Sequence, residues 1–162
     1  RLIPYIYSEY MKAALNDEMM FKPLSFVFRD DELACEIEDQ LIMGNIMITP
    51  VYTQNVTGRY VYLPEKMTFV KFMPDGNIYS EDLEKGVHFV KINVNEVPLF
   101  IRENVNIMVV KQEVITNENN QKKIMDCSIK YSKEDFEVIG VSKEKYSYKM
   151  YNDDGISKDY ML

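Results

Sequence analysis

The sequence predicts a mainly β protein: an antiparallel β-sandwich that follows a single N-terminal α-helix. Two observations support this fold class. Beyond residue 23 the chain consists of short apolar segments bounded by Gly, Pro, Asn and Asp, with no alternating helices between them. Before that point, apolar residues recur every three or four positions, which is the period of one helix face. We expect a terminal helix and connection at 1–23, a β-sandwich at 24–110 and a strand extension at 111–162, packed on the same sandwich.

The predicted helix covers residues 1–16. Pro4 is tolerated in a first turn, and Asn16-Asp17 ends the helix. Because a terminal amphipathic helix has to bury its apolar stripe against a partner, we expect the chain to be the end of a longer protein. In isolation the stripe should stay partly uncovered and cause self-association. The stripe consists of Ile3, Ile6, Tyr7, Tyr10, Met11 and Ala14.

Short strands are expected along the remainder of the chain. The polar stretch 30–39 has room for a helical turn, and 117–123 is expected to be a solvated loop. Gly44-Asn45 and 74–77 have strong turn chemistry. The predicted strands are 24–28, 40–43, 46–49, 60–63, 67–73, 87–94, 97–101, 107–115, 124–131, 136–141 and 146–151.

The alternation of side chains along each strand predicts which residues are buried. Val61 and Leu63 should share the inward face of their strand, with Tyr60 and Tyr62 on the other face. Leu99 and Ile101 are predicted to be buried in the same core.

Composition excludes several classes of function. The 162 residues suit one domain, or one domain with an appendage, and the 46% apolar content argues against disorder. The net charge of −7 disfavours a nucleic-acid surface, which needs clustered Lys and Arg. No apolar run approaches the roughly 20 residues that span a bilayer. The acidic, cysteine-poor chain leads us to expect a cytoplasmic location.

The residues that usually carry metals, phosphates or nucleophiles are scarce. Cys35 and Cys127 are the only cysteines and are expected to be reduced thiols packed as small apolar residues. The single histidine, His88, has no neighbouring acid or cysteine, so we expect an ordinary strand residue. Zinc sites need several His and Cys at short spacing, and the segment 153–155 lacks the ligand spacing of a calcium loop. We therefore predict no catalytic, cofactor-binding or metal-ligating residue in this chain.

A series of short motifs resembles the C-terminal part of family 31 glycoside hydrolases, the α-glucosidase and α-xylosidase group. Each motif is weak alone, but their order and spacing are those of the family. The resemblance covers residues 1–102 and 148–155, whereas 103–147 departs from the family pattern. The motifs are Lys22-Pro23-Leu24, Glu38-Asp39-Gln40-Leu41, Met43-Gly44, Thr49-Pro50-Val51, Arg59-Tyr60-Val61-Tyr62-Leu63-Pro64 and Val97-Pro98-Leu99-Phe100-Ile101-Arg102, with 148–155.

The resemblance implies a non-catalytic role. It identifies the first helix as similar to the last helix of a (β/α)8 barrel, and it places the two catalytic carboxyl groups of a retaining glycosidase, about 5–5.5 Å apart, on barrel loops upstream of the matched region. Within this chain the candidate pairs are Asp30-Asp31 and Asp153-Asp154. Because adjacent residues in extended chain point to opposite faces, we expect both pairs to be solvated turn acids.

Three further groups have competing interpretations. The acids of Glu38-Asp39-Gln40 are expected to cap turns or to pair with Arg or Lys, and Arg59 is expected to bind a surface carboxylate. A sugar-binding aromatic platform could form from Tyr146 and Tyr148, which share a strand face, whereas Tyr151 points away. A half-buried strand explains the same tyrosines more simply.

Three functions are compatible with the sequence. The leading hypothesis is the non-catalytic C-terminal β-sandwich of an α-glucosidase-like enzyme, with the catalytic barrel of the same parent chain as its partner. The alternative is a free-standing sandwich that binds carbohydrate or protein. An independent enzyme is the third, and the missing acid pair counts against it.

Overall fold

The computed structural model describes residues 1–93, 96–115, 131–140, 142 and 147–151. They fall into two compact units. One, the helix unit, comprises residues 1–18, 107–139 and 145–162, and the other, the sheet unit, comprises 19–106 and 140–144. The division at residues 23 and 110 that we expected from the sequence stays a prediction. In the described part no helix has the length and apolar character needed to cross a membrane.

The helix unit is built around α1, Ile3–Asn16. Pro4 lies in its first turn, and the helix ends at Asp17, which takes a left-handed conformation with φ of 54°. The unit also contains strands β9, Asn106–Val110, and β10, Phe136–Gly140, which pair in a two-stranded sheet, with the short helices α4, Gln112–Ile115, and η1, Lys133–Asp135.

The buried face of α1 differs from the apolar stripe. Tyr5 stacks on Tyr148 at 5.5 Å between ring centroids, and Ser8 Oγ accepts a hydrogen bond from the Tyr151 amide at 2.9 Å. Glu9 accepts hydrogen bonds from the Tyr148 hydroxyl and the Lys12 ammonium. The described C-terminal residues therefore cover the polar side of the helix. Much of the stripe remains uncovered, with exposed fractions of 52% for Ile3, 38% for Ile6 and 55% for Tyr10.

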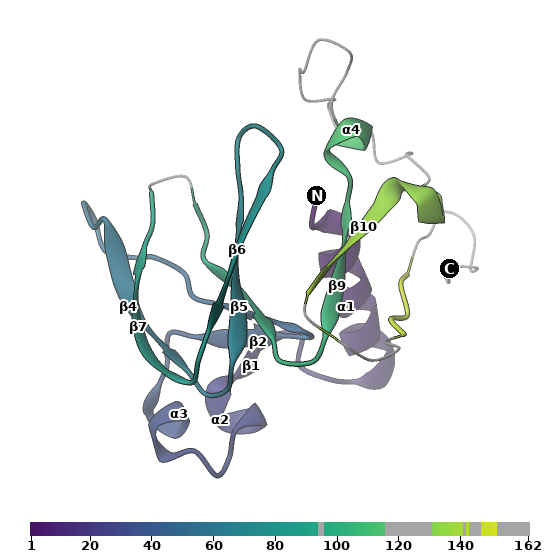
Figure 1. Cartoon of the computed structure of the whole chain (residues 1–162). Helices are drawn as coiled ribbons and strands as arrows, with labels where there is room; N and C mark the ends of the chain where they lie inside the picture. Colours follow the sequence, from purple (N-terminus) through teal and green to yellow (C-terminus); the bar gives the residue numbers. More distant parts are fainter. Residues whose placement is uncertain (94–95, 116–130, 141, 143–146, 152–162) are drawn as a thin grey trace. The chain divides into compact units, whose positions relative to one another are not determined.

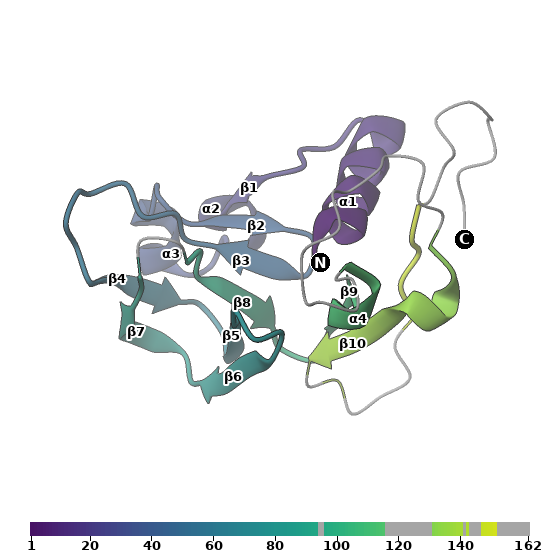
Figure 2. The ribbon, with the colours of Figure 1, turned by 90° about the horizontal axis from the view of Figure 1, so that it is seen from above.

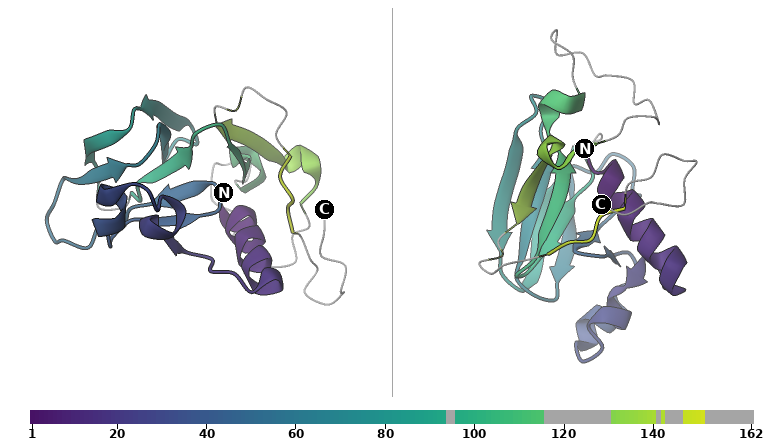
Figure 3. Two further views of the ribbon diagram at one scale, coloured as in Figure 1. Left: turned by 90° about the horizontal axis from the view of Figure 1, so that it is seen from below. Right: turned by 90° about the vertical axis from the view of Figure 1, so that its right-hand side faces the viewer.

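The sheet unit contains two antiparallel sheets (Figures 1 and 2). The larger has the order β1-β2-β3-β8-β5-β6, and the smaller pairs β4 with β7. The strands are β1 Lys22–Pro23, β2 Leu41–Met43, β3 Ile46–Ile48, β4 Gly58–Leu63, β5 Met67–Phe72, β6 Ile78–Leu83, β7 Gly86–Lys91 and β8 Leu99–Arg102. Two short helices, α2 Leu24–Val27 and α3 Glu32–Glu36, lie at one end of the strands (Figures 1 and 3). The predicted mainly β, sandwich-like fold with an N-terminal helix is confirmed.

The core of the sheet unit lies between the two sheets. Val61 and Leu63 from β4 are fully buried and belong to the same core cluster as Met47, Met67 and Phe100 of the larger sheet. Leu99 and Ile101 are also buried, as predicted. Tyr60 is 70% exposed, but Tyr62 is only 7% exposed because the α2–α3 segment covers it and its hydroxyl donates to Asp31 at 2.7 Å. We expected both tyrosines to lie on the face away from the core. Tyr60 is exposed there, but Tyr62 is buried.

Gln40 joins the two sheets directly. Its side chain is 1% exposed and stands immediately before β2. Its Nε2 donates to the Tyr62 carbonyl at 2.7 Å, and its Oε1 accepts from the Tyr62 amide at 2.9 Å. The side-chain amide thus occupies the place that a backbone amide of a third strand would take beside β4. We call this pair of bonds the Gln40 clamp.

Several predicted strands are corrected. Residues 24–28 form α2 instead, because Leu24, Val27 and Phe28 have helical spacing and all reach the core. Strand β6 was not predicted because its outward residues are mostly polar. The predicted strand 107–115 stops at Val110 and continues into α4. Residues 147–150 form no strand, and the segments 117–123 and 124–130 lie outside the described residues.

Removing a core side chain from β4 should destabilise the sheet unit far more than removing the same side chain from its surface. Leu63→Ala should cost about 2–5 kcal/mol through lost transfer energy and the cavity left behind. Leu33→Ala, on α3, should cost less than about 1 kcal/mol, because Leu33 is 42% exposed. Urea melts of the two variants with matched m-values check this. Equal midpoint shifts would mean that the core is assigned wrongly.

Candidate functional site

The structure gives structural roles to the acidic motif around residue 39. Asp39 accepts a hydrogen bond from Arg59 Nη2 at 2.6 Å and another from the Tyr52 hydroxyl at 3.1 Å. Arg59 Nη1 also donates to the Pro50 carbonyl. The predicted pairing with Arg or Lys is confirmed for Asp39, and so is that of Arg59 with a surface carboxylate. Gln40 has the larger structural role, which sequence reasoning missed.

Asp31 is not the solvated turn acid that we expected. Its Oδ1 accepts from the Ala34 amide and caps α3, and its Oδ2 accepts from the Lys85 ammonium at 2.6 Å and the Tyr62 hydroxyl. The hydrogen bonds from Lys85 and Tyr62 lower the pKa of this carboxyl from 3.8 to about 2. Asp30 is exposed, as expected, and Asp153 and Asp154 lie outside the described residues.

The remaining candidate residues form no catalytic arrangement in the described part. Cys35 is an exposed free thiol, so the expected packing as a buried apolar residue is wrong for it, and Cys127 lies outside the described residues. His88 is a strand residue of β7, in hydrogen-bond contact with the Glu84 carbonyl at 2.7 Å. Among described residues, no three His, Cys, Asp or Glu side chains gather as a metal site would require.

The tyrosines proposed as a sugar platform are engaged inside the helix unit. The Tyr148 ring is stacked on Tyr5 on one side, and the Lys12 ammonium lies 3.7 Å from its centroid. Tyr151 is 6% exposed, and Tyr146 lies outside the described residues. The two described tyrosines therefore offer no flat exposed surface to a sugar ring.

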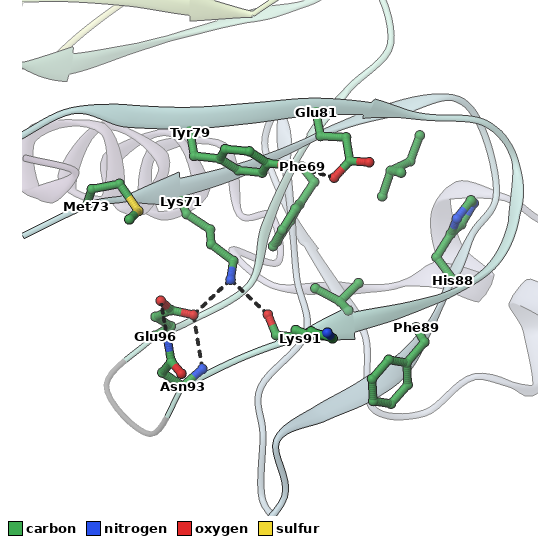
Figure 4. A pocket seen from close by; sticks show the side chains of 12 residues that line it. Phe69, Lys71, Met73, Tyr79, Glu81, His88, Phe89, Lys91, Asn93 and Glu96 are labelled. Atoms are coloured by element: carbon green, nitrogen blue, oxygen red, sulfur yellow. Dashed lines mark hydrogen bonds and ion pairs between the residues drawn. The ribbon is translucent and has the colours of Figure 1, made fainter.

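A groove of about 630 Å³ lies in the sheet unit, between the edge strand β6 and strand β7 (Figure 4). Period-two alternation along β5 and β6 builds one part of its lining: residues 69, 71 and 73 come from β5 and the turn after it, and residues 79, 81 and 83 from β6. Residues 88–91 of β7 line the other part, with Asn93 and Glu96 at one end. We call it the β6–β7 groove. The sequence could not reveal it because β6 lacks an apolar alternation.

A network of charged and amide groups fixes one end of the groove. Lys71 Nζ donates to Glu96 Oε2 at 3.0 Å and to the Lys91 carbonyl at 2.8 Å, and therefore ties β5 to β7. The Asn93 amide and its side-chain Nδ2 donate to the two Glu96 oxygens. The hydrogen bond from the Asn93 backbone amide, together with the one from Lys71, lowers the pKa of Glu96 from 4.5 to about 2. The groove end is therefore held by an ionised pair at neutral pH.

Aromatic side chains line the other part of the groove. The Phe69 ring forms the floor at 5% exposed and packs tilted against Phe100, with centroids 5.1 Å apart. Tyr79 stands edge-on to Phe69 at 6.4 Å and is 46% exposed, and its hydroxyl donates to Glu81 at 2.9 Å. Tyr79 and Glu81 face the groove from one side, with His88 and Lys91 across from them (Figure 4).

Comparison with known proteins places this sheet unit in a family. Residues 17–107 match the family model for the glycosyl hydrolase family 31 C-terminal domain. The match covers more than half of the chain. The chain belongs to glycosyl hydrolase family 31. The resemblance inferred from the motifs is thereby confirmed.

Individual relatives agree with this assignment. The alpha-xylosidase of Saccharolobus solfataricus is 31% identical over 99% of this chain, which spans only 20% of that enzyme. A family 31 sulfoquinovosidase from E. rectale superposes with a TM-score of 0.55 at 26% identity, over 64% of this chain and 15% of that one. A family 31 dextranase from Flavobacterium johnsoniae has the same fold, with a TM-score of 0.66 at 21% identity, over 98% of this chain and 18% of that one.

The network at the groove end should make the stability of the folded chain depend on pH. Because the pKa of Glu96 in the folded chain lies below that in the unfolded chain, the network contributes to stability above about pH 4.5 and loses this contribution as the pH falls through about 2. Lys71→Met should raise the Glu96 pKa only part of the way to 4.5, since the Asn93 bonds remain. A pH titration of the glutamate carboxyl carbons by NMR measures this.

Lys66→Met is the matched control for this titration. Lys66 pairs with Glu84 at 2.9 Å outside the groove, so its loss should leave the Glu96 pKa unchanged. The network is wrongly described if Glu96 titrates near 4.5 in the unmodified chain, or if both variants shift it equally.

Proposed function

We propose that this chain is the non-catalytic C-terminal region of a family 31 α-glycosidase and supports a catalytic barrel in the same polypeptide. The observation that carries the proposal is the alignment of 99% of the chain with only 20% of the Saccharolobus alpha-xylosidase. The rest of such an enzyme would carry the chemistry. Four acids of the sheet unit agree with this role, because ion pairs with Lys or Arg hold Asp31, Asp39, Glu65 and Glu96.

The surface of α1 supports a partner within the same polypeptide. Its Ile3, Ile6 and Tyr10 side chains stay exposed, and an apolar stripe of this kind is normally buried against a neighbouring element. We propose the preceding barrel as its occupant. Self-association of the isolated chain through the same stripe stays a prediction, which light scattering tests. A cytoplasmic location is likewise proposed, on the acidic composition and the low cysteine content.

A chimera tests the supporting role. The 162 residues of this chain would replace the corresponding C-terminal fifth of the Saccharolobus alpha-xylosidase. We expect the chimera to fold and hydrolyse an aryl α-xyloside, because the barrel regains its supporting domain. The same enzyme truncated without a replacement should be insoluble or inactive, and the isolated chain should show no turnover of aryl α-xylosides or α-glucosides.

Two results would contradict this account. Turnover by the repurified isolated chain would make it an enzyme in its own right. A truncated enzyme as active and as thermostable as the chimera would remove the supporting role, and would favour the alternative of a free-standing sandwich that binds carbohydrate or protein.

A further inference from the structure

We propose that the β6–β7 groove binds a short neutral oligosaccharide, as an accessory site on a domain without catalytic groups. The choice of sugar as the ligand class rests on the proposed function, whereas the location rests on the groove itself. Its volume of about 630 Å³ lies within the range of about 300–1,000 Å³ that is usual for ligand pockets.

The charges of the groove favour a neutral ligand. Lys71 and Lys91 balance Glu81 and Glu96, so the lining carries no net excess of either sign. A phosphate-bearing ligand would be held by clustered cations. A divalent cation would need oxygen ligands without ammonium groups among them. Neither condition is met, because the lining mixes two lysines with two acids. The cations are too few for a phosphate, and the acids have ammonium groups among them.

The groove has both hydrogen-bond donors and hydrogen-bond acceptors that remain available to a ligand. An ammonium group has three hydrogens to donate, and Lys71 uses two of them on Glu96 and the Lys91 carbonyl. The Lys91 ammonium itself has no partner among the described residues. Glu81 accepts the Tyr79 hydroxyl through Oε2, and Asn93 donates one hydrogen from its backbone amide and one from Nδ2, which leaves a second Nδ2 hydrogen and the Oδ1 acceptor. Hydroxyl groups of a sugar are both donors and acceptors, and so match this mixture.

An apolar surface lies beside these polar groups. The Tyr79 ring is 46% exposed, and Phe69 holds it edge-on, so it meets a ligand in a fixed orientation. Met73, 40% exposed, extends the apolar surface from β5. A sugar ring presents an apolar C–H face and a polar rim, and this groove offers a surface for each.

The β7 edge of the groove disfavours a peptide strand as the occupant. Strand addition needs free backbone groups along an edge. On the β7 side, the Lys91 carbonyl accepts a hydrogen bond from Lys71, and the Glu84 carbonyl just before the strand is in hydrogen-bond contact with His88. Charged side chains also line this side of the groove. A sugar needs none of these backbone groups.

The test is a titration of the full 162-residue chain with isomaltotriose, in which the NMR chemical shifts of the backbone amides report binding. We expect saturable shifts at the groove residues of β5, β6 and β7 and at Asn93 and Glu96. Tyr79→Ala should weaken the affinity at least about tenfold. Tyr52→Ala is the matched control, because Tyr52 is 74% exposed and lies outside the groove, and it should bind like the unmodified chain. Thermal melts establish that both variants are folded.

The proposal is overturned if isomaltotriose gives no saturable shifts, if the shifts map elsewhere, or if both tyrosine variants lose affinity equally. Competition by inorganic phosphate would also overturn it, since a balanced lining should not prefer an anion. The outcome is separable from the supporting role. Tyr79→Ala in the chimera should leave turnover of a small aryl α-xyloside unchanged, so loss of sugar binding and loss of activity report on different claims.

Discussion

The Gln40 clamp is the interaction on which the rest of the sheet unit depends. A two-stranded sheet such as β4–β7 is marginal in water by itself, and β4 has one edge beside which the described part of the chain places no strand. Gln40 satisfies both the amide and the carbonyl of Tyr62 at that edge, in a site from which water is excluded. An unpaired buried donor or acceptor costs about 1–3 kcal/mol, so the clamp decides whether the small sheet stays on the larger one.

The groove follows from how the two sheets are joined. The Gln40 clamp holds β4 close to the start of β2, whereas Lys71 holds the end of β7 to β5 through the Lys91 carbonyl. Between these attachments, β6 and β7 are edges that no further strand of the described residues covers. The space left there is lined by charges that neutralise one another and by the ring of Tyr79. The sugar site that we propose would therefore lie in the space that the two attachments leave open.

The sequence predicts an element correctly where a local pattern of residues is enough to cause that element. The helix was found from its apolar spacing, although its buried side is set by Tyr148 and Tyr151, which no local pattern could place. The paired strands flanking Gly44-Asn45 were found from turn chemistry. Strand β6 was missed because an exposed edge strand has no apolar face. The motif Glu38-Asp39-Gln40 drew attention to its acids, but its buried amide forms the contact that joins the sheets, and only the tertiary structure shows it.

Amide hydrogen exchange in a Gln40→Ala variant tests the central role of the clamp most directly. Gln54→Ala, in an exposed loop, is the matched control. The Gln40 variant should lose at least about tenfold of the protection at the Tyr62 amide, equivalent to about 1.4 kcal/mol of local opening. Amides of the β4–β7 pair should follow, while those between β3, β8 and β5 keep theirs. Unchanged protection at Tyr62, or an equal loss throughout both sheets, would contradict the account.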